Sequence, residues 1–118
     1  MRSPKPHHRL QAWQDSMALV RMVYDLTGLF PKEETYGLAS QLRRAAVSIP
    51  SNLAEGAGRD GRKEFVRFLS IARGSLSEME TQLLIAVDLG YLAPDHGVFP
   101  LLEKVSRLIS GLHRKLSG

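Results

Sequence analysis

The fold is decided by residues 64–86, which read EFVRFLSIARGSLSEMETQLLIA. Apolar residues recur there at alternating steps of four and three, at Phe65, Leu69, Ala72, Leu76, Met79, Leu83 and Ala86. An average period of 3.5 places these side chains on one face of a helix and favours left-handed bundle packing. We predict a helix over residues 62–89 that stops at Gly90, because glycine suits the position just beyond a helix.

Three further segments show helical periodicity. In the first, Trp13, Met17, Val20, Tyr24 and Thr27 follow steps of four and three, and a second stripe beside them adds Ala12, Leu19, Val23, Leu26 and Phe30. Pro31 is expected to end this helix. The second begins near Thr35 as N-cap, and its apolar face is Ala39, Leu42, Ala46, Ile49, Leu53 and Ala57. The fourth follows Pro94 and Asp95, and its stripe is Val98, Leu102, Val105, Ile109, Leu112 and Leu116.

Strand signals are missing from the sequence, which has no hairpin dipeptide and no sustained alternation. Four helices with short connections predict an all-α, antiparallel up-down-up-down, left-handed four-helix bundle over residues 10–118. Residues 1–9 are expected to be a flexible basic arm, because Pro4 and Pro6 should exclude a helix there.

Composition narrows the function classes. The chain has 118 residues, enough for one domain, and its formal net charge is +4. It has no cysteine, which excludes disulfides, thiolate catalysis and Cys-ligated metals and fits a cytoplasmic protein. No apolar run approaches the roughly 20 residues that span a bilayer, so no membrane association is expected.

Residues 48–59, which read SIPSNLAEGAGR, place a proline and two glycines inside a helical pattern. Pro50 cannot donate to the carbonyl of Ala46, so we predict a kink there. Ser48, Ser51 and Asn52 could bond the freed backbone groups, and Gly56 and Gly58 should loosen the helix end. A bend that seats the helix on its neighbours is favoured over a chemical site, although both interpretations stay open.

The same residues carry a resemblance. SIPSNLAEGAGR, together with EFVRFLSIARGSLSEMETQLLIAVDLGYL at 64–92, WQDSMALVRMVYDLT at 13–27 and LASQLRRAAVSIP at 38–50, resembles the four-helix-bundle proteins of the 23S rRNA intervening-sequence family. The resemblance covers roughly residues 10–110. Its motif residues here are Ser48, Pro50, Ser51, Asn52, Glu55 and Gly56.

This resemblance implies a non-catalytic bundle that assembles as a homopentamer and binds RNA, either rRNA or a template RNA. A related branch, the accessory variability proteins of diversity-generating retroelements, works with a reverse transcriptase. A protein partner of that kind is therefore a second expectation.

Basic residues gather between positions 43 and 73, namely Arg43, Arg44, Arg59, Arg62, Lys63, Arg67 and Arg73. Three acidic residues oppose them, so this segment carries the whole net charge of +4. In a helical hairpin turning at Asp60–Gly61, four of them should cluster at one end of the bundle and could contact RNA phosphates: Arg59, Arg62, Lys63 and Arg67. The alternative is a structural oligomer whose arginines pair with Glu64, Glu78 or Glu80, or lie at subunit contacts, as Arg44 and Arg73 could. No aromatic residues are interleaved for base stacking.

The sequence gives less support to an enzyme than to an RNA-binding or structural protein. His7, His8, His96 and His113 show no metal-binding spacing, and we expect neither metal nor cofactor. Arg107 and His113 have the Arg-x5-His spacing of HEPN-type ribonucleases. Six residues along a regular helix leave the two side chains about 120° apart, so this hypothesis is not favoured.

Overall fold

The computed structural model describes residues 5–118, and within that range it contains helices and no strand. Its elements, in order, are the short 3-10 helix η1 (Pro6–Arg9), α1 (Gln11–Thr27), the 3-10 helix η2 (Lys32–Glu34), α2 (Leu38–Ala57), α3 (Arg62–Asp88) and α4 (Val98–Ser117). The predicted all-α fold is confirmed.

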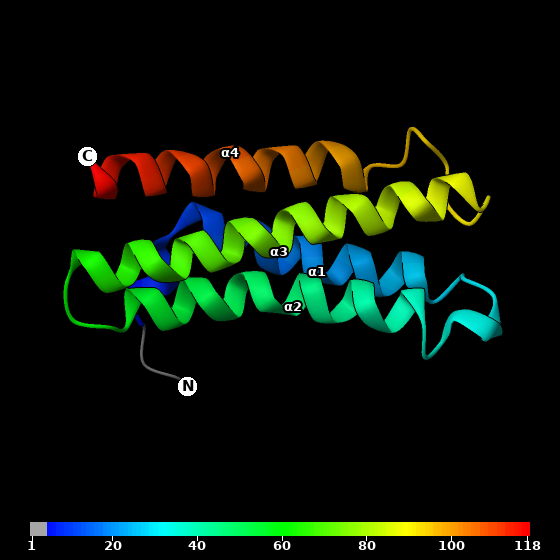
Figure 1. Cartoon of the computed structure of the whole chain (residues 1–118), viewed down its shortest axis with the longest axis horizontal. Helices are drawn as coiled ribbons and strands as arrows, with labels where there is room; N and C mark the ends of the chain where they lie inside the picture. The colour runs from blue at the N-terminus through cyan, green and yellow to red at the C-terminus, as the bar shows by residue number, and fades with distance from the viewer. Residues whose placement is uncertain (1–4) are drawn as a thin grey trace.

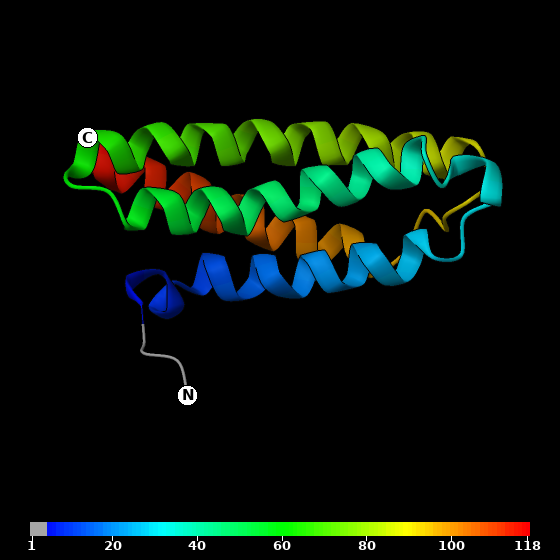
Figure 2. The same cartoon turned by 90° about the horizontal axis from the view of Figure 1, so that it is seen from below.

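The four long helices run antiparallel to their sequence neighbours, as Figures 1 and 2 show from two sides. Each helix packs against the next in sequence, and α1 also packs against α4, which closes the bundle. The most extensive contact joins α2 to α3. These contacts confirm the up-down-up-down four-helix bundle, while its left-handed supercoil stays a prediction.

The core is aliphatic and comes from all four helices. Its largest fully buried side chains are Leu19, Val23, Leu42, Ile49, Leu53, Leu69, Met79, Leu83, Val98, Val105 and Ile109. The stripes predicted for α3 and α4 therefore face inward, with one adjustment. Phe68, which is not part of the predicted α3 stripe, is buried, whereas Phe65 is only partly buried at the edge of the core.

In α1 the core face is the second of the two predicted stripes. Leu19, Val23 and Leu26 are buried, whereas Met17 and Tyr24 are each 45% exposed. Ser16 is one of two buried polar residues of α1, with Thr27, and its Oγ donates to the Trp13 carbonyl at 2.8 Å. Because that hydroxyl is satisfied within its own helix, serine can occupy the core without the cost of an unpaired polar group.

Two predicted helix boundaries are wrong. The first helix ends at Thr27, so Pro31 does not end it. The second begins at Leu38 with Gly37 as N-cap, so Thr35 does not cap it. Glu34 supplies the missing acceptor instead, because its Oε1 accepts from the Leu38 amide at 3.1 Å.

The Glu34 carboxylate also fastens the α3–α4 loop to the start of α2. Its Oε2 accepts a hydrogen bond from the Tyr91 hydroxyl at 3.1 Å. This hydrogen bond is the main cause that raises the pKa of Tyr91 above its usual value. The hydroxyl therefore keeps its proton, and hence the contact, at neutral pH.

Pro50 is buried inside α2, which is assigned as one helix from Leu38 to Ala57. The predicted kink stays a prediction. Asn52 does not bond the freed carbonyl of Ala46. Its Nδ2 instead donates to the Ser48 carbonyl at 2.7 Å and to the Ser48 Oγ at 2.9 Å. At the end of α3, Gly90 has φ 80°, as its predicted role beyond the helix requires.

The first residues of the predicted arm, 1–4, lie outside the described residues. The expectation that proline excludes a helix is wrong for Pro6, which starts η1. Proline at a first helical position loses no hydrogen bond and has a suitable φ. His7 and His8 then pack on the ring of Trp13, with ring centroids 5.0 and 5.1 Å away.

Candidate nucleic-acid interface

Three segments that are distant in sequence meet at one end of the bundle. Figures 1 and 2 place η1, the α2–α3 turn and the C-terminus of α4 at this end. We call the Lys and Arg residues of these segments the basic end: Lys5, Arg9, Arg59, Arg62, Lys63, Arg67, Arg114 and Lys115. The acidic residues there are Glu55, Asp60 and Glu64.

The opposite end of the bundle has the reverse charge. The loops and helix ends there carry Asp25, Glu33, Glu34, Asp88 and Asp95 against a single Lys32. The two ends of the bundle therefore differ in charge, and a polyanion would be attracted to the basic end more strongly than to the loops of the opposite end.

The α2–α3 turn is held by two glycines. Gly61 has φ 93°, a conformation that L-residues rarely adopt, and it is the N-cap of α3. Gly56 is buried where α2 crosses α3: a Cβ added to it would lie 2.9 Å from the Cβ of Phe68 and 3.0 Å from Cδ1 of Phe65. Gly56 therefore permits a close approach of the two helices, whereas the sequence interpretation gave it the role of loosening the helix.

Phe68 organises two of the arginines in this turn. The guanidinium carbons of Arg59 and Arg67 lie 5.4 and 5.2 Å from the centroid of its ring, within the range of cation–π attraction. Arg59 is also paired with Glu55 at 2.7 Å, and Arg67 lies 3.9 Å from Glu64. These two arginines are thus positioned by the fold and partly neutralised.

Arg62 and Lys63 differ from them. Both are exposed in the first turn of α3, and within residues 5–118 neither forms an ion pair. Cations are unfavourable at a helix N-terminus, so the stability of α3 does not explain them. No side chain caps this terminus, so its first amides add to a local environment that favours an anion.

The chain ends add basic residues that the sequence interpretation missed. Arg114 and Lys115 lie in the last turn of α4, where they also suit the helix dipole. Lys5 at the N-cap of η1 and Arg9 at its end are the basic residues there, and partial burial, with help from His8 and Lys5, lowers the pKa of His7. An up-down-up-down topology brings both chain ends to the α2–α3 turn, so the predicted fold could have identified them.

Three predicted contact residues lie elsewhere. Arg43 is in the groove between α1 and α2, where its Nε donates to Thr27 Oγ1 at 2.8 Å. Arg44, the next residue of α2, is exposed beside it. The 1.5 Å rise per residue puts this pair about 20 Å from the end of α2. Arg73 lines a separate cleft between α3 and α4.

The motif residues of α2 mainly serve helix packing. Ser48 Oγ lies 2.8 Å from Ser75 Oγ of α3, which links the two helices. Asn52, one turn later in α2, donates a hydrogen bond to the same Ser48 Oγ. Pro50 and Gly56 are buried, and Glu55 pairs with Arg59. Ser51 is exposed, and nothing in the structure explains it.

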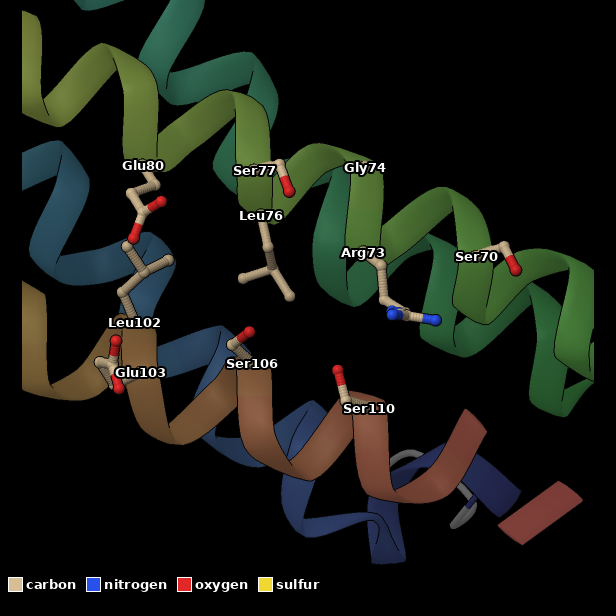
Figure 3. A pocket seen from close by; sticks show the side chains of 10 residues that line it. All are labelled: Ser70, Arg73, Gly74, Leu76, Ser77, Glu80, Leu102, Glu103, Ser106 and Ser110. Carbon is tan, nitrogen blue, oxygen red and sulfur yellow. The ribbon is translucent and has the colours of Figure 1, made fainter. Parts of the chain in front are cut away.

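The cleft between α3 and α4 has a volume of about 350 Å³. Figure 3 shows small side chains, such as Ser77, Ser106 and Ser110, on its walls, with Arg73 directed across it toward α4. The ribonuclease-like pair does not converge here. Arg107 lies 3.7 Å from Glu103, and His113 Nε2 lies 3.1 Å from Ser70 Oγ.

Residues 5–118 contain no group of three or more His, Asp or Glu side chains placed to hold a metal ion. Over the same range, every helix is too short or too polar to cross a bilayer.

Comparisons with known proteins agree with this fold. Residues 8–113 match the family described as 23S rRNA-intervening sequence protein. One solved structure, of a protein with unknown function from the S23 ribosomal protein family of Bacteroides thetaiotaomicron VPI-5482, aligns with a TM-score of 0.66. It is 19% identical, and the alignment covers 89% of this chain and 94% of that one, so the likeness establishes the fold alone. No curated protein matches the sequence significantly.

Proposed function

Because the chain belongs to the 23S rRNA-intervening sequence protein family, we propose that it is a non-catalytic RNA-binding protein whose basic end contacts the phosphate backbone. The observation that carries this proposal is the meeting of eight basic side chains from three separate segments at one end of the bundle. The family name supplies RNA as the polyanion.

The chemistry of the basic end supports contact with phosphates. Arg62, Lys63, Arg114 and Lys115 are exposed cations on helix ends. Phe68 is buried beneath Arg59 and Arg67, Phe65 packs at the edge of the core, and His7 and His8 pack on Trp13. Such a surface binds through the release of counterions and does not select a sequence.

Salt dependence tests this proposal. We expect fluorescence anisotropy with a labelled blunt RNA duplex to show binding whose log affinity falls with log salt concentration at a slope of about −4, since each of four or more phosphate contacts contributes about −0.9. A shallow slope, or no binding at low salt, would contradict it.

A specific observation also favours self-association. Leu84 and Ile85 of α3 and Leu89 at its C-cap are exposed apolar residues, and Ile85 and Leu89 lie one turn apart on one face; Ile71 is exposed farther back along the helix. An apolar face of this kind is typical of a protein–protein contact. We infer that the protein forms a homo-oligomer through α3, as the resemblance to pentameric relatives also implies. A stable oligomer that does not bind RNA would favour the purely structural role.

The α3 contact makes its own prediction. Ile85→Asp places a charge in the proposed contact without touching the core, so we expect light scattering to show a smaller species than the wild type, with an unchanged helical signal. Arg21→Asp, on the exposed surface of α1, is the matched control and should leave the assembly intact. A monomeric wild type, or an Ile85→Asp variant of wild-type size, would refute this contact.

A further inference from the structure

A groove of about 590 Å³ lies between α1 and the start of α2, near the acidic end of the bundle. Its walls include Tyr24 of α1, Tyr36 of the turn before α2, and Arg43, Arg44 and Val47 of α2. The function proposed above uses none of these residues.

Arg43 is fixed in this groove. Its guanidinium carbon lies 4.8 Å from the centroid of the Tyr24 ring, and its Nε donates to Thr27 Oγ1 at 2.8 Å. That hydroxyl donates in turn to the Val23 carbonyl at 2.6 Å, so its lone pairs are directed to accept from Arg43. The terminal amino groups of Arg43 make no hydrogen bond within residues 5–118 and can reach a ligand.

The charge of the groove selects an anion. Arg44 is exposed beside Arg43 and forms no ion pair within the described part of the chain. No acidic residue lines the groove. Two arginines without a facing carboxylate make a local positive potential, although the loops at this end of the bundle are acidic.

The aromatic residues narrow the choice of anion. Tyr36 is 96% exposed, so it contributes nothing to the core, and the Tyr24 ring is about half exposed. Accessible aromatic faces beside arginines are the usual platform on which unpaired bases stack, while the cations meet the phosphates. The hydroxyls of Thr35 and Ser40 add hydrogen-bonding groups around the same groove.

We propose that this groove holds an unpaired segment of RNA, with a base stacked on Tyr36 and a phosphate contacted by Arg43 and Arg44. The proposal rests on the proposed function for the identity of the polyanion. It adds a second site about 20 Å along α2 from the basic end, so that a duplex at the basic end and its single-stranded extension bind together.

Two RNAs separate this proposal from the proposed function: a blunt duplex, and the same duplex with a single-stranded extension. We expect the extension to raise the affinity of the wild-type protein about tenfold, as stacking of one base does. Tyr36→Ala and Arg44→Ala should abolish most of this gain and leave blunt-duplex affinity nearly unchanged. Tyr36→Phe, which keeps the ring, should retain the gain.

The basic end serves as the opposite control. Arg62→Ala with Lys63→Ala should weaken binding of both RNAs by the same factor and preserve the gain from the extension. No gain in the wild type, or a gain that survives Tyr36→Ala and Arg44→Ala, would overturn the groove assignment alone. Failure of both RNAs to bind would overturn the proposed function as well. Binding of a glutamate-rich peptide that Tyr36→Ala abolishes would reassign the groove to a protein partner.

Discussion

Alanine at Arg62, Lys63, Arg114 and Lys115 together is expected to weaken binding of a blunt RNA duplex by about 100-fold at physiological salt, because several phosphate contacts are lost at once. These four residues are exposed on helix ends, and none forms an ion pair in the described structure, so their removal should not disturb the core. Arg59 and Arg67 are left in place because they stack on Phe68.

A matched variant removes the same charge elsewhere. Alanine at Arg21, Lys32, Arg73 and Arg107 takes four cations from other parts of the bundle, and we expect it to weaken duplex binding by less than about fivefold. Circular dichroism should show both variants folded. An equal loss in the two variants would mean that net charge alone governs binding and that the basic end is no site.

The second large effect is on stability. Gly56→Ala is expected to lower the free energy of unfolding by about 2 kcal/mol, because the new methyl group would overlap Phe68 and Phe65 across the α2–α3 contact. The Cβ of Phe68 is fixed to the backbone, so relief requires the two helices to separate, and that costs more than the better helix propensity of alanine returns. Urea denaturation followed by circular dichroism measures the difference.

Gly74 provides the control for Gly56. It lies inside α3, and a Cβ added there would meet no atom within 4 Å. Gly74→Ala should therefore stabilise the bundle by about 0.5–1 kcal/mol, the ordinary propensity gain in a helix interior. A Gly56→Ala protein as stable as the wild type would show that α2 and α3 are not held at this close approach.

Periodicity was sufficient to predict the bundle where each stripe was unambiguous. In α3 and α4 the apolar residues follow one set of steps, and that set faces the core, with Phe65, Leu112 and Leu116 partly buried at its ends. In α1 two stripes have the same helical spacing, and a buried serine at position 16 hides the one that faces the core. Which stripe is buried depends on how the other helices pack against α1. The spacing of residues within α1 does not show it.

Only part of the basic end could be predicted from the sequence, for a similar reason. Local charge marked Arg59, Arg62, Lys63 and Arg67, but Arg114 and Lys115 join them only through the topology of the bundle. The role of Gly56 was misread because a close approach depends on the neighbouring helix. Tyr36 gave no signal in the sequence, because only the turn before α2 places it on the groove that Arg43 also lines.

Lysine footprinting with RNA tests the central claim most directly, because the lysines sample the whole length of the bundle. Acetylation is measured by mass spectrometry with and without a saturating blunt RNA duplex. The account predicts strong protection of Lys63 and Lys115 and unchanged reactivity at Lys32, at the opposite end, and at Lys104, which lies 3.2 Å from Asp15. Equal protection of Lys32 and Lys63, or no protection of Lys63 and Lys115 in the bound state, would contradict it.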